Sequence, residues 1–158
     1  MTIITIALLA LALILALLMS IVDWRERLIP DIYLFPFMLI GMLLVALGTL
    51  PWTTPVYSAI AGLFAYFLTF GINQLFKMRN QKIHNKKRIV HGLDAIGMGD
   101  IKLLGAGGIW LGVAGLPAAV IVACVIGYVW GVRNKERFVP FAPFFFVGAL
   151  VSMAIMLW

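Results

Sequence analysis

The chain has 158 residues, a mean hydropathy of +1.10 and only 11% charged residues. About a quarter of the residues in a soluble domain are charged, so the composition excludes a soluble domain and indicates an integral membrane protein. The net charge of +6 does not indicate a nucleic-acid partner, because the basic residues lie in short segments between apolar runs, as topology signals do.

Six apolar runs follow one another along the chain. The first, from Met1 to Val22, carries no charge and is long enough to cross the hydrocarbon core at about 1.5 Å per residue. The others cover approximately residues 32–50, 56–76, 100–115, 117–132 and 139–158. We therefore predict an all-α, polytopic membrane helical bundle with six transmembrane helices, forming a single domain over residues 1–158.

The basic residues predict the orientation of this bundle. All 12 lie between the first and second runs, between the third and fourth or at the start of the fourth, and between the fifth and sixth. With six crossings they all fall on one side, which the positive-inside rule assigns to the cytoplasm, so both termini are expected to face out. The basic segment 77–88 is a topology signal that can also meet anionic lipid head groups.

Two acidic residues lie at the edges of apolar runs. Asp23 ends the first run, and Asp100 follows Gly97 and Gly99 and opens the fourth. Charges at such positions are costly to keep and often mark a working site. The predicted topology places both carboxyl groups at the cytoplasmic membrane edge, at similar depth, where they can face each other.

Two carboxyl groups within reach of one water form an acid–base pair, since close like charges cannot both ionise easily and come to share one proton. The ionised group takes a proton from water while the protonated group polarises a carbonyl. This is the chemistry of aspartyl proteolysis, and it needs no metal or nucleotide. Gly97 and Gly99 would let an extended substrate backbone approach Asp100 closely.

Other interpretations remain open from the residues alone. Asp100 can be a helix N-cap, and Asp23 can be an interfacial acid paired with Arg25 or Arg27. Lys102 can be an anchor at the membrane edge. The two acids could also serve as ion ligands or as a proton relay in a small transporter or channel, or the chain could be a non-catalytic assembly factor.

Three segments resemble a known family. They are the stretch from Ile21 to Asp31 with its Asp and later Ile-Pro-Asp, the Gly-Met-Gly-Asp-Ile-Lys-Leu-Leu sequence at 97–104, and Val-Pro-Phe-Ala-Pro-Phe at 139–144. In this order they are similar to the conserved segments of the type IV prepilin peptidases, which are intramembrane aspartyl proteases with a GxGD motif. The first and third segments make the resemblance specific, because GxGD alone also occurs in presenilin-like proteases.

The resemblance implies that Asp23 and Asp100 are the catalytic aspartates and that Gly97, Gly99 and Lys102 support the site or the substrate. Asp94 stands where many relatives carry a Glu. The implied reaction is removal of the basic leader of a prepilin or pseudopilin precursor at the cytoplasmic face of the bacterial inner membrane. The chain lacks the paired CxxC motifs of the two-activity relatives, so we expect a peptidase-only form.

No cofactor or metal is expected. The sequence contains one cysteine and two histidines, His84 and His91, which flank a basic run in a polar segment without a carboxylate at ligand spacing. We expect these histidines to be solvated. The expected partners are the precursor substrate and a bilayer with anionic lipids, and no nucleic acid.

Overall fold

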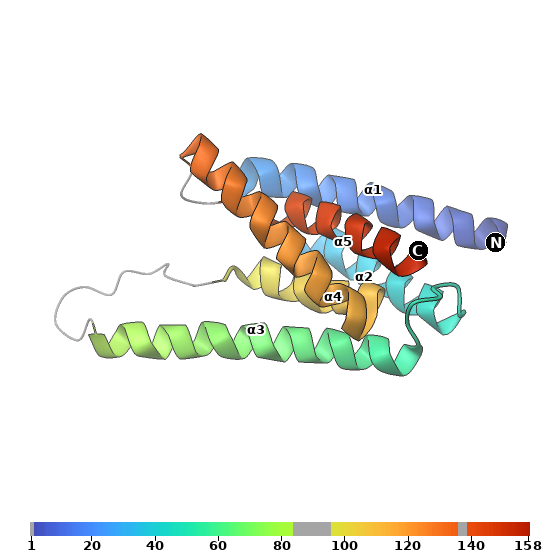
Figure 1. Cartoon of the computed structure of the whole chain (residues 1–158), viewed down its shortest axis with the longest axis horizontal. Helices are drawn as coiled ribbons and strands as arrows, with labels where there is room; N and C mark the ends of the chain where they lie inside the picture. Colours follow the sequence, from blue (N-terminus) through green and yellow to red (C-terminus); the bar gives the residue numbers. More distant parts are fainter. Residues whose placement is uncertain (1, 84–95, 136–138) are drawn as a thin grey trace.

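The computed structural model describes residues 2–83, 96–135 and 139–158, except for the side chains of residues 80–83. All regular secondary structure in these ranges is helical (Figure 1). The helices are α1 (Ile3–Glu26), α2 (Asp31–Ala46), α3 (Pro55–Ile83), α4 (Met98–Asn134) and α5 (Phe141–Leu157). The prediction of an all-α bundle is therefore confirmed for the described part of the chain.

Three of the helical segments are long and apolar enough to cross a membrane: Ile3–Glu26, Pro55–Arg79 and Met98–Asn134. The helices Asp31–Ala46 and Phe141–Leu157 are apolar but shorter. Large apolar side chains such as those of Leu13, Ile60 and Ile121 are more than half exposed. A bilayer solvates such a surface, whereas water would not, and the chain is therefore treated below as a membrane protein.

The described residues form five helical elements where six were predicted, because the fourth and fifth runs are joined in one element, α4. Its backbone is interrupted at Gly112, where φ is 66° and ψ is −170°. The chain turns back there, so that the two arms of α4 run in opposite directions (Figure 1). Only glycine adopts this φ readily, and a Cβ at Gly112 would lie 2.6 Å from Thr53 Oγ1. The sequence predicts this break at residues 115–117 instead.

Two helix ends also differ from the predicted limits. α1 continues to Glu26, past the predicted end of the first run at Val22, so Asp23 lies within its last turn. α3 continues to Ile83, so the first part of the basic segment 77–88 is helical. The rest of that segment, together with Asp94 and both histidines, lies outside the described residues. Pro30 and Asp31 open α2, as the sequence predicted.

The first arm of α4 forms the centre of the bundle. Ile101, Leu103 and Ala106 are fully buried, and a Cβ at Gly108 would lie 2.6 Å from the carbonyl carbon of Ala61 in α3. Further along, Trp110 stacks on Phe37 of α2 with 4.9 Å between ring centroids and donates from Nε1 to the Phe37 carbonyl at 3.1 Å. These contacts fix the position of the helix whose first turn carries Asp100.

Candidate active site

Asp23 lies at the end of α1 where the helix is firmly packed. Its side chain is 4% exposed. The helix stops at Arg27, which has a left-handed φ of 55° and donates its backbone N–H to the Asp23 carbonyl at 3.0 Å. Next to Asp23, Trp24 packs edge-on against Trp130 and Phe144, with 5.1 and 6.3 Å between ring centroids. The end of α1 is thus held against the last turns of α4 and the start of α5.

The Asp23 carboxylate receives a hydrogen bond from α5. The backbone N–H of Ala142 donates to Asp23 Oδ2 at 2.8 Å, across 119 residues of sequence. Ala142 is completely buried, and the preceding Pro140 is also inaccessible. The third family-like segment, residues 139–144, therefore contributes a backbone donor to the site. Arg27 acts on the same carboxylate through its charge.

Asp100 lies in the first turn of α4. The N-cap of this helix is Gly97, so Asp100 is not the N-cap residue. The Asp100 side chain instead turns back toward Gly97, where a Cβ would lie 3.2 Å from Asp100 Oδ2. The backbone N–H of Gly97 also interacts with this carboxyl group, as in the second half of a capping box. A larger residue at position 97 would press on the Asp100 carboxyl group.

Gly99 allows α4 to approach the connection between α1 and α2. A Cβ at Gly99 would lie 3.0 Å from the Cβ of Ile29, which is itself buried. Ile29 follows Asp23 by six residues, so this contact draws the start of α4 toward the end of α1. The two motif glycines thus have separate roles, one beside the Asp100 carboxyl group and the other in helix packing.

The structure brings Asp23 and Asp100 to the same end of the bundle. The end of α1, the start of α4 and the start of α5 lie together, at the left in Figure 1. The charge of Asp23 acts on the Asp100 carboxyl group. Asp23 is buried, whereas Asp100 is partly accessible, so a substrate or water can reach the pair from the Asp100 side.

Lys102 is directed away from the two acids. Its Nζ forms an ion pair with Asp31 Oδ2 at 2.6 Å, and both side chains are partly exposed, at 31% and 49%. Nζ also lies 6.0 Å from the ring centroid of Phe35. Lys102 therefore links α4 to the start of α2, which is a supporting position.

Replacing Lys102 by methionine is expected to change the free energy of unfolding by less than about 1 kcal/mol, because exposed ion pairs contribute little. Thermal unfolding of the purified protein in detergent would measure this. Asp31→Asn should have the same small effect, and the double variant should lose no more than either single variant. A larger loss on removal of Lys102 alone would mean that it has a contact beyond Asp31.

Asn73 was not among the residues that the sequence pointed to. This residue of α3 is 1% exposed, and its Oδ1 accepts a hydrogen bond of 3.4 Å from the backbone N–H of Ile96, directly before Gly97. A buried polar side chain needs such partners, so Asn73 helps to fix the entry to the GxGD turn. The only sign of Asn73 in the sequence was a polar side chain within the third apolar run.

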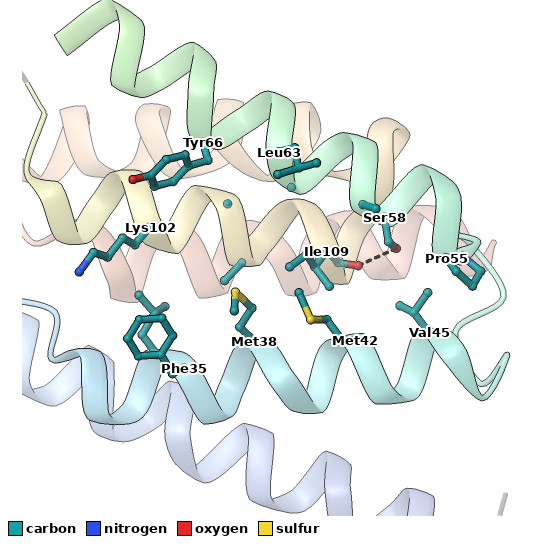
Figure 2. A pocket seen from close by; sticks show the side chains of 15 residues that line it. Phe35, Met38, Met42, Val45, Pro55, Ser58, Leu63, Tyr66, Lys102 and Ile109 are labelled. Carbon is teal, nitrogen blue, oxygen red and sulfur yellow. Dashed lines mark hydrogen bonds between the residues drawn. The ribbon is translucent and has the colours of Figure 1, made fainter. Parts of the chain in front are cut away.

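A cavity of about 660 Å³ lies between α2, α3 and α4 (Figure 2). Its lining is mostly apolar and includes Phe35, Met38 and Met42. Lys102 lies at one end, and at the other Ser58 Oγ donates to the Ile109 carbonyl at 2.8 Å. Asp23 and Asp100 are not among its lining residues, so this cavity does not contain the candidate active site.

The chain is similar to known proteins over most of its length. Residues 8–132 match the model of the type IV leader peptidase family. Proteins described as prepilin leader peptidase/N-methyltransferase match over most of the chain. The protein from Burkholderia pseudomallei is 35% identical over 85% of this chain, and that from Pseudomonas aeruginosa is 27% identical over 85%. The Escherichia coli protein is 25% identical over 89%.

The matched regions cover 42%, 44% and 59% of these three relatives, respectively. The chain thus spans about half the length of the curated relatives it matches. No solved structure matches it.

Proposed function

Because the chain belongs to the type IV leader peptidase family, we propose that it removes the leader peptide from type IV prepilin-like or pseudopilin precursors. The observation that carries the proposal is the position of Asp23 and Asp100 at one end of the bundle, where the charge of Asp23 acts on the Asp100 carboxyl group, within a sequence that matches this family from residue 8 to 132. Relatives described as prepilin leader peptidase/N-methyltransferase support the same substrate class.

The reaction is hydrolysis of one peptide bond by an aspartyl mechanism. One carboxylate of the pair takes a proton from a water molecule, and the resulting hydroxide equivalent adds to the scissile carbonyl carbon. The other carboxyl group donates its proton to the carbonyl oxygen. Collapse of the tetrahedral intermediate breaks the C–N bond, and a proton passes to the leaving amine. Gly97 leaves room beside Asp100 for an extended substrate backbone, Gly99 lets α4 pack against Ile29, and Lys102 supports the start of α4.

The end of the bundle that carries Asp23 and Asp100 lies at the cytoplasmic face of a bacterial inner membrane. Arg25 and Arg27 at the end of α1, and Arg133 at the end of α4, support this orientation through the positive-inside rule. The two arms of α4 then cross the bilayer separately, which places both chain termini outside. Anionic head groups surround the basic residues at the inner surface.

The alternative, a small transporter using Asp23 and Asp100 as ion ligands, is not favoured by the family match. In a transporter the two acids would bind and release a cation or proton and would cleave no bond. Measurement of leader removal therefore separates the two functions.

The test is co-expression of the chain with a type IV prepilin in a host without its own prepilin peptidase. Mass spectrometry of the pilin N-terminus is expected to show removal of the leader. The matched control is the same prepilin expressed without this chain, which should remain full length. Full-length wild-type prepilin alongside correctly inserted enzyme would refute the proposal.

A further inference from the structure

The first turn of α5 has few backbone donors. The first four N–H groups of an α-helix have no acceptor within the helix. In α5 these positions are the N-cap Pro140 followed by Phe141, Ala142 and Pro143. Proline has no N–H group, so only Phe141 and Ala142 have a donor that needs an outside partner.

One of the two remaining donors, the Ala142 N–H group, forms a hydrogen bond with Asp23. The Ala142 N–H donates to Asp23 Oδ2 at 2.8 Å, and the backbone of Phe141 also interacts with this carboxylate. Asp23 and Ala142 are buried, at 4% and 0% exposure, so bulk water cannot replace either partner. The two prolines thus leave α5 with just the donors that a single carboxylate can accept.

The arrangement suits a negative charge. Backbone N–H groups at a helix N-terminus stabilise a carboxylate, and such bonds are stronger than those between neutral groups. Among the residues that the structure describes, Arg27 of its own helix and, across the site, Asp100 of α4 act on Asp23 through their charges. The Ala142 donor holds the Asp23 carboxylate in a fixed place despite the nearby Asp100.

We propose that the turn from Pro140 to Pro143 is the positioning element of Asp23, which it holds toward Asp100 through the backbone N–H group of Ala142. This inference rests on the proposed function for its catalytic consequence, but its structural part can be tested without any substrate. It assigns a physical role to the third family-like segment, which contributes no acidic side chain to the pair.

Ala142→Pro removes the donor directly. The first turn of a helix accepts proline, and the substitution eliminates the N–H group that Asp23 accepts. We expect kcat for prepilin cleavage to fall at least about tenfold while KM changes less than about threefold. Ala142→Gly keeps the N–H group and should lose no more than about threefold in kcat. A folded Ala142→Pro protein with more than half of the wild-type kcat would overturn the proposal.

A second measurement does not depend on activity. Asp23→Asn keeps an oxygen that can accept the Ala142 N–H, whereas Asp23→Ala leaves the buried Ala142 donor without a partner. In detergent, Asp23→Ala should melt about 5 °C below Asp23→Asn. The matched control is the exposed Asp31, whose alanine and asparagine variants should melt within about 2 °C of each other. Equal melting of the two Asp23 variants would refute the positioning role.

The outcomes separate this inference from the proposed function. If Asp23→Asn still cleaves prepilin, the assignment of Asp23 as a catalytic residue fails, while the melting comparison still decides whether α5 holds the side chain. If Asp23→Asn is inactive but the two Asp23 variants melt alike, the catalytic assignment stands and the positioning element is refuted. Should Ala142→Pro fail to insert or fold, the melting comparison alone decides.

Discussion

Replacement of either Asp23 or Asp100 by asparagine is expected to reduce leader removal by roughly a thousandfold or more. General acid–base catalysis contributes about 10²–10⁴-fold to a rate, and in an aspartyl mechanism neither partner can replace the other. Asparagine has nearly the same size as aspartate, but its amide group can act neither as a general acid nor as a general base. The measurement is the initial rate of leader removal from a purified prepilin in detergent micelles, followed by mass spectrometry.

A loss of cleavage reports on catalysis only if the Asp23→Asn and Asp100→Asn variants remain folded. Asparagine at position 23 still offers an oxygen to the Ala142 N–H, so the packing of α5 on α1 should survive. Asp31→Asn and Glu26→Gln remove acidic groups that are exposed near the same end of the bundle. These two control variants should cleave at close to the wild-type rate. Normal cleavage by a folded Asp23→Asn or Asp100→Asn protein would show that the replaced residue is not catalytic.

The sequence predicted the elements that depend on local composition. Apolar runs marked the helices, the Pro30–Asp31 pair marked the start of α2, and the glycine-flanked Asp100 marked the start of α4. The sequence did not predict where α4 bends. Several glycines and Pro117 lie close together there, and composition does not say which residue adopts non-helical backbone dihedral angles. The contact of Gly112 with Thr53, which favours glycine at that place, is tertiary.

In the candidate site, too, the sequence predicted some features, whereas others depend on tertiary contacts. The sequence marked Asp23, Asp100, Gly97 and Gly99 as a group, and the structure places them at one end of the bundle; their catalytic and supporting roles remain predictions. The hydrogen bond from Ala142 to Asp23 could not be predicted, since it joins residues 119 positions apart through a backbone group. The link from Asn73 to Ile96 likewise depends on how α3 lies against the start of α4.

Gly148→Ala tests whether the position of α5 matters to the site. A Cβ at Gly148 would overlap the carbonyl oxygen of Ala119, a backbone atom that no side-chain rotation can move. Overpacking of a helix interface costs about 1–3 kcal/mol, and a collision with backbone falls at or above the upper end of this range. Thermal unfolding in detergent should therefore show a loss of about 3 kcal/mol. Gly71→Ala in α3 is the matched control, because a Cβ there meets nothing within 4 Å.

The same pair of variants connects packing to activity. Relief of the collision at Gly148 requires α5 to move away from α4, and its first turn, which donates to Asp23, must move with it. A displacement of about 1 Å in a catalytic arrangement can cost about 100-fold in rate, so Gly148→Ala should lose cleavage of that order even where it remains folded. Gly71→Ala should cleave normally and melt at or above the wild-type temperature, since alanine favours a helix over glycine. Normal cleavage by Gly148→Ala would mean that the site tolerates displacement of α5, and the fixed geometry of Asp23 would then not be needed for the reaction.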